Sequence, residues 1–205
     1  TVKQGDSNRN PRGTTGGARM TAVLGSATAV AAAKIIDLAK PFAAEVLECN
    51  EDDLNFTDGL FLRQDTNRSI AIEDLVRQLA ISGEKHRLNW AQPYETDGAT
   101  YPYGCHIIEL EIDRQTCAVE IASYHVVDDF GLVINPLTLE GQIHGGIAQG
   151  VGQALLERVV YDDSGQLLAG SLMDYALPRA DHFPGFQISM RNTACTNNTL
   201  GIKGS

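Results

Sequence analysis

The sequence lacks several patterns that would each indicate a definite class of protein. Its formal net charge is −10, so it lacks the basic surplus that binding to nucleic acid or to an anionic membrane would favour. It has no run of about 18 apolar residues, and its first residues carry no apolar segment typical of a signal peptide. These absences predict a cytoplasmic protein that binds no nucleic acid and has no membrane span.

Signatures of common catalytic and metal sites are absent as well. No Cys-x-x-Cys or Cys/His metal spacing occurs among the four cysteines, which are Cys49, Cys105, Cys117 and Cys195. A reduced protein is the simpler interpretation, although the sequence does not exclude a disulfide. No Gly-x-Ser-x-Gly motif is present, and the scattered acidic residues identify no catalytic pair. His106, His125 and His144 lack a second ligand at a suitable spacing, so we predict no metal ligand in this chain.

The periodicity of apolar residues predicts a mixture of helices and hairpins over the 205 residues. An alanine-rich run over 21–47 has helical spacing, with a kink or break expected near Pro41. Asp58-Gly59 separates two short apolar runs and predicts a β-hairpin. The other expected elements are a strand beginning at Ser69, helices over 72–79 and about 139–157, strands over 103–113, 118–127 and 186–191, and a hairpin over 159–168. This order predicts an α+β fold with mixed sheets, either as one domain or as two subdomains of about 1–95 and 96–205.

The most unusual stretch lies between Val126 and Glu157. Its helical part contains glycines at positions 141, 145, 146, 150 and 152. Each interior glycine lowers helix stability by roughly 0.8–1 kcal/mol relative to alanine. Close approach of another backbone or of a ligand commonly offsets such a cost. Gln149 lies among these glycines, and its amide would bond either a cofactor or a neighbouring carbonyl.

Two further segments could hold an anion or a nucleotide. The loop Gly13-Thr-Thr-Gly-Gly-Ala-Arg19 precedes the first long helix, where exposed N–H groups and the helix dipole suit a phosphate. An ordinary flexible loop that ends in a helix cap explains it equally well, and no Gly-Lys-Ser/Thr follows to make a P-loop. Asp128-Asp129, with Asn135-Pro136 downstream, would hold a base or ribose, or simply form a turn with solvated acids.

Several motifs in order resemble one known family. VVDDFGLVINPLTLEGQIHGGIAQGVGQALLE, over 126–157, resembles the large molybdopterin-binding subunit of the xanthine oxidase / carbon monoxide dehydrogenase / aldehyde oxidase family of molybdenum hydroxylases, in its C-terminal half. The resemblance continues through 161–167 and 170–179 and includes 101–113 and the start of the chain. It implies a molybdopterin cofactor-binding domain and a molybdenum cofactor, commonly the cytosine dinucleotide form in bacterial members.

The resemblance also implies which residues approach the cofactor. The loop over 13–19 matches the cradle of its pyrophosphate, Gln149 matches a glutamine near the molybdenum, and Leu200-Gly-Ile-Lys-Gly204 leads towards a Gly-Glu-Ala-Gly motif. That motif carries the catalytic glutamate, which is expected beyond Ser205, so this chain holds no catalytic residue of its own. Phe130 stands where the family commonly has cysteine. The implied cofactor-binding residues are Gln4, Asp6, Gly13, Thr14, Thr15, Gly16, Gly17, Ala18, Arg19, Asp129, Asn135, Gln149 and Lys203.

The resemblance implies an oxidoreductase that oxidises carbon monoxide, an aldehyde or an N-heterocycle with water as the oxygen source. Implied partners are the rest of the large subunit, an iron–sulfur subunit and an FAD subunit, assembled as a dimer of heterotrimers. The sequence does not determine the substrate or whether the enzyme uses copper. The chain alone is expected to be catalytically incomplete. Two other hypotheses stay open: a cofactor-free structural or assembly module of the same fold, and a generic nucleotide-binding domain.

Overall fold

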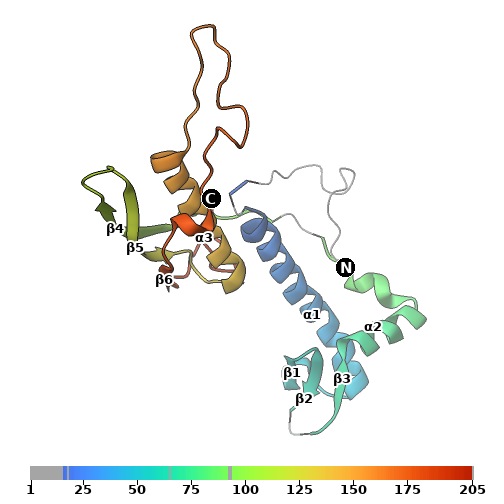
Figure 1. Ribbon diagram of the computed structural model, residues 1–205. Coiled ribbons are helices and arrows are strands. Elements are labelled where there is room, and N and C mark those ends of the chain that lie inside the picture. The colour runs from blue at the N-terminus through green and yellow to red at the C-terminus, as the bar shows by residue number, and fades with distance from the viewer. Residues whose placement is uncertain (1–15, 18, 65, 92–93, 205) are drawn as a thin grey trace. The chain divides into compact units, whose positions relative to one another are not determined.

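The protein folds as two compact units in the computed structural model, which describes residues 16–17, 19–64, 66–91 and 94–204. The N-terminal unit comprises the chain up to Ala99 together with Asn197–Leu200. The C-terminal unit begins at Thr100 and includes the last residues from Gly201 onwards. Both units combine helices with a three-stranded sheet, so the predicted α+β fold is confirmed (Figure 1).

Helix α1 (Ser26–Leu47) is the longest element of the N-terminal unit, and a π-helical segment, Met20–Gly25, leads into it. Ala39, Ala43 and Leu47 recur every four residues and form its buried face. Of the two alternatives expected near Pro41, the break is wrong, because the helix continues through this residue, and the kink stays a prediction. Pro41 has no N–H to donate to the Asp37 carbonyl one turn earlier. Both residues lie on the exposed side of α1, where water can bond that carbonyl instead.

The sheet of this unit is antiparallel, in the order β1 (Leu54–Thr57), β2 (Leu60–Arg63), β3 (Ser69–Ala71). The predicted hairpin turn is confirmed: Asp58 and Gly59 both have positive φ, at 48° and 79°, as a tight two-residue connection requires. Helix α2 (Ile72–Ile81) follows β3 directly. Phe61 and Leu75, each 1% exposed, join the buried face of α1 in one core cluster.

The C-terminal unit has a mixed sheet in the order β4 (Tyr103–Ile112), β5 (Val119–Asp129), β6 (Phe186–Arg191). Strand β5 pairs antiparallel with β4 and parallel with β6. Three strands were predicted at these places, but not the parallel pairing. The apolar face expected on β4 is not covered by the described residues, since Ile108, Leu110 and Ile112 are all about half exposed, at 45–59%.

Helix α3 (Pro136–Val151) covers one face of this sheet, and a π-helical segment, Gly152–Leu156, extends it (Figure 1). Ile143 and Ile147 lie one turn apart and pack with Tyr124 and Val126 of β5. The glycine-rich helix is therefore confirmed, although it begins earlier than residue 139. The hairpin expected over 159–168 is reduced to a single bridge between Tyr161 and Leu167.

Helical residues Met20–Leu47 are long and apolar enough, by length and composition, to cross a membrane. The core helix of a globular unit passes the same test, and α1 contributes Ala39, Ala43 and Leu47 to the buried cluster of its unit. The absence of a membrane span therefore stays a prediction.

Candidate functional site

The expected pyrophosphate loop is only partly described. Gln4, Asp6, Gly13, Thr14, Thr15 and Ala18 lie outside the described residues. Gly17 has φ +40°, and the Arg19 N–H donates to the Gly16 carbonyl at 3.2 Å, so a tight glycine turn enters the helical segment. A Cβ added at Gly16 would meet no atom within 4 Å, and Arg19 is exposed. This open backbone beside the exposed Arg19 suits an anion.

The glycines of α3 divide into two groups. A Cβ at Gly152 would lie 2.4 Å from Glu157 Oε1 and 2.7 Å from Pro178 Cγ, so the fold of this unit itself requires glycine there. A Cβ at the other four glycines would meet nothing within 4 Å among the described residues; these are Gly141, Gly145, Gly146 and Gly150. Packing within the described chain therefore does not offset the helical cost of these four glycines.

The two polar residues expected on this segment have different surroundings. Gln149 is exposed and lies one turn beyond Gly145, on the open glycine face. Asn135 is the N-cap of α3, where its side-chain oxygen accepts the Thr138 N–H at 3.2 Å and Pro136 occupies the first turn. The Asn135 oxygen thus has a local structural role.

Asp129 ends β5 and is 2% exposed. Its carboxylate accepts the Gly131 N–H at 2.9 Å and the Tyr103 hydroxyl at 3.1 Å, and Lys203 Nζ lies 3.0 Å away. A hydrogen bond with the Thr193 side chain completes the set. Asp129 and Lys203 are therefore brought together, and both are engaged within the C-terminal unit.

These contacts shift both pKa values in the direction that keeps the pair charged. The Thr193 hydroxyl, followed by the Gly131 amide and by Lys203 and Tyr103, holds the pKa of Asp129 far below its ordinary value despite burial. Burial alone would lower the pKa of Lys203, but the bond to Asp129 and the contact with Tyr103 outweigh it, so that pKa is raised. Lys203 Nζ also lies 4.5 Å from the centre of the Tyr103 ring, at cation–π distance.

The segment that carries Lys203 crosses the turn after Asp129 closely enough for the two backbones to form hydrogen bonds. Leu132 and Cys195 both donate their N–H to the Gly201 carbonyl at 2.9 Å, and Lys203 donates its N–H to Phe130 at 2.8 Å. A Cβ at Gly131, which has φ +71°, would lie 2.4 Å from the Gly201 oxygen. Only glycine fits this crossing, because both its backbone conformation and the space exclude a side chain.

A second polar cluster was not predicted. His106 Nδ1 lies 3.1 Å from the Tyr124 hydroxyl, and His106 Nε2 lies 3.3 Å from Asp128 Oδ1. Burial, with a contribution from the Asp128 charge, raises the pKa of Tyr124. The strand pattern already placed these residues on neighbouring strands, but only the register of β4 against β5 shows that they meet.

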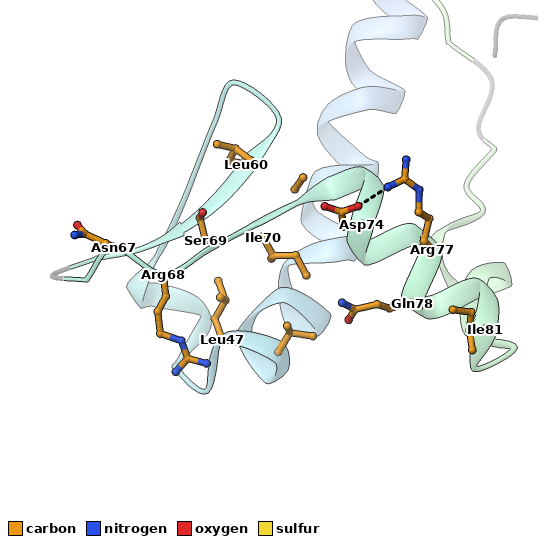
Figure 2. A pocket seen from close by; sticks show the side chains of 12 residues that line it. Leu47, Leu60, Asn67, Arg68, Ser69, Ile70, Asp74, Arg77, Gln78 and Ile81 are labelled. Atoms are coloured by element: carbon orange, nitrogen blue, oxygen red, sulfur yellow. Dashed lines mark hydrogen bonds and ion pairs between the residues drawn. The ribbon is translucent and has the colours of Figure 1, made fainter.

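The N-terminal unit has an open hollow beside β3 and α2, shown in Figure 2. Its rim includes Arg68 and Arg77, which are already paired with Glu48 and Asp74. None of the predicted site residues lines it. Among the described residues, no group of three or more His, Cys, Asp or Glu side chains is placed to hold a metal ion, and all four cysteines are free thiols.

Comparison with known proteins identifies the family of this chain. The family described as "Molybdopterin cofactor-binding domain" matches residues 1–184. The carbon monoxide dehydrogenase large chain of Hydrogenophaga pseudoflava is 35% identical over 99% of this chain and 26% of its own length. The Cu,Mo-CO dehydrogenase in its carbon monoxide reduced state aligns over 94% of this chain and 24% of its own, with TM-score 0.79 and 30% identity. Quinoline 2-oxidoreductase from Pseudomonas putida 86 aligns over 90% and 24%, with TM-score 0.73 and 31% identity.

The chain therefore spans about a quarter of the length of these relatives. The matches cover both units and all the motifs on which the resemblance rested, so that resemblance is confirmed. The chain belongs to the family of molybdopterin cofactor-binding domains, and it is similar to part of the carbon monoxide dehydrogenase large chain and to part of quinoline 2-oxidoreductase.

Proposed function

We propose that this chain holds a molybdenum–molybdopterin cofactor within a larger oxidoreductase subunit. The observation that supports this most directly is the open glycine face of α3. Four glycines weaken the helix without being needed by any described neighbour, which is expected if a flat ligand or another chain segment approaches the helix backbone. Gln149 is exposed on the same face and offers two N–H donors and one carbonyl acceptor.

The residues present fit such a group by their chemistry. Arg19 and the backbone at Gly16 and Gly17 would hold the pyrophosphate by charge and by N–H donors. Gln149 would orient the end of the cofactor that bears the metal. The bound cofactor supplies two-electron oxidation, while the protein binds and orients it. Asp129, Asn135 and Lys203 contribute indirectly, since their described side-chain contacts lie within the fold.

The finer features belong to the same proposal. The cofactor is the cytosine dinucleotide form, and electrons leave through iron–sulfur clusters and FAD on partner subunits, in a cytoplasmic dimer of heterotrimers. The substrate is carbon monoxide, an aldehyde or an N-heterocycle. The general base follows Ser205 in the complete subunit. The names of two relatives support carbon monoxide and an N-heterocycle, because one is the large chain of a carbon monoxide dehydrogenase and the other is a quinoline 2-oxidoreductase.

The test uses the full-length protein from the native gene. Metal analysis, pterin fluorescence and release of CMP on acid hydrolysis measure the cofactor and its nucleotide. We expect molybdenum and pterin in equal amounts; absence of both would overturn the proposal in favour of a cofactor-free module of the same fold. Binding of ordinary nucleotides without pterin would instead support a generic nucleotide-binding domain.

The substitution Gly145→Ala tests whether the cofactor lies against the open glycine face of α3. In an open helix position Gly145→Ala should stabilise α3 by up to about 1 kcal/mol. If the cofactor approaches that backbone, the same change lowers the molybdenum and pterin content. Gly185→Ala is the matched control, because it adds the same methyl group at a glycine outside α3 with equally open space.

A further inference from the structure

Several hydrogen bonds hold the segment 201–204 against the turn 130–132 and against Thr100. Backbone hydrogen bonds already join the two at Gly201 and Lys203. Thr100 adds a further clamp, because its hydroxyl bonds both the carbonyl and the N–H of Gly204. The chain is thus held at each residue from Gly201 to Gly204, with Ile202 paired to Gly131 in a β-bridge.

The buried ion pair beside this crossing is not explained by stability alone. Removing a carboxylate and an ammonium group from water is costly, and well-packed apolar residues of similar size commonly replace such a pair without loss of stability. A charged, hydrogen-bonded pair adds a fixed geometry, because Asp129 accepts from fixed donors and, among the described residues, Lys203 forms an ion pair with Asp129 alone. Two apolar side chains would keep their packing if the segment 201–204 shifted, whereas the ion pair would lose its hydrogen bonds and therefore opposes the shift.

We propose that Asp129 and Lys203 are a positioning pair that fixes the backbone of the segment 201–204, and that they are not cofactor ligands. This rests on the proposed function, in which the residues after Ser205 carry the general base. The Asp129 carboxylate is already reached by four donors, and the Lys203 amine contacts both that carboxylate and the Tyr103 ring. The pair therefore acts on the reaction through the backbone that it holds.

The experiment uses the full-length protein with Asp129→Asn, Lys203→Met and the two changes combined. The matched control is Asp74→Asn with Arg77→Met, which removes an exposed ion pair on α2. Three quantities are measured: molybdenum and pterin content, amide hydrogen exchange of peptides that cover 195–204, and kcat and KM on whichever of carbon monoxide, benzaldehyde and quinoline the wild type oxidises.

We expect the variants to keep their molybdenum and pterin. Exchange in the 195–204 peptides should become about tenfold faster or more, since hydrogen bonds to a charged group are lost. Misplacement of the following segment should lower kcat by about 100-fold while KM changes little. The double variant should be no worse than either single one, because the two residues act as a unit. The Asp74/Arg77 control should match the wild type in all three quantities.

Two results would overturn the inference. Loss of molybdenum and pterin in proportion to activity would make Asp129 or Lys203 a cofactor ligand, and unchanged exchange in the 195–204 peptides would show that the pair does not hold the segment. A wild-type protein without molybdenum and pterin contradicts the proposed function instead. In that case the exchange measurement still decides whether the pair fixes the segment.

Discussion

Lys203 Nζ lies 3.0 Å from Asp129 Oδ1, and the two side chains are only 10% and 2% exposed. A strand end and the last described segment of the chain are thereby joined at one buried point.

The Asp129–Lys203 pair should make stability depend on pH at both extremes. The pKa of Asp129 is lowered in the folded protein, so its contribution is complete above the unfolded value of about 3.9 and is lost as the pH falls towards the folded value. The pKa of Lys203 is raised, so its contribution is complete below about 10.4 and is lost as the pH rises beyond that. Urea midpoints of the wild type and Asp129→Asn should differ by a constant amount between about pH 5 and pH 9 and converge in acid. A difference that grows in acid would contradict the assignment.

Gly131→Ala should destabilise the C-terminal unit more than a change of backbone preference alone explains. A left-handed conformation costs a non-glycine residue roughly 1–2 kcal/mol, and here the added methyl group would also meet the Gly201 oxygen at 2.4 Å. Gly165→Ala is the control, since Gly165 has φ +83° but open space around it. Equal losses in thermal unfolding of the two variants would show that the crossing relaxes without cost.

Phe61→Ala should lower the free energy of unfolding of the N-terminal unit by about 3–5 kcal/mol. Phe61 is 1% exposed and packs in the same cluster as α1 and α2, so its removal leaves a cavity. Ile81→Ala, at a side chain that is 88% exposed, should change stability by no more than about 0.5 kcal/mol. Denaturant titration measures both, and comparable effects would mean that the cluster is not the core of this unit.

Asn135→Ala should weaken the start of α3 by about 0.5–2 kcal/mol, because the Thr138 N–H loses its acceptor. Asn135→Ser keeps an N-cap oxygen and should retain most of the stability. If Asn135 contacted a cofactor instead, both variants would lower pterin content without a difference in unfolding. Thermal unfolding combined with pterin fluorescence distinguishes the two roles.

Elements that depend on neighbours in the chain were predicted well. The Asp58-Gly59 turn, α2 and the glycine-rich helix follow from turn chemistry and apolar spacing, which act over a few residues. A break at Pro41 does not occur, because its position on the exposed side of α1 lets water replace the missing hydrogen bond. The order of motifs was also enough to identify the family.

Contacts between distant segments had to come from the tertiary structure. Asp129 and Lys203 were both among the implied cofactor-binding residues, yet nothing in their local sequence indicates that they pair with each other. Local sequence also does not indicate that β6 pairs parallel with β5. The same holds for the contacts of His106 with Tyr124 and Asp128. The sequence alone determined the elements, the family and the glycine content of α3. Tertiary packing decided which polar groups satisfy one another and which glycines stay open, because burial and register depend on segments far apart in the chain.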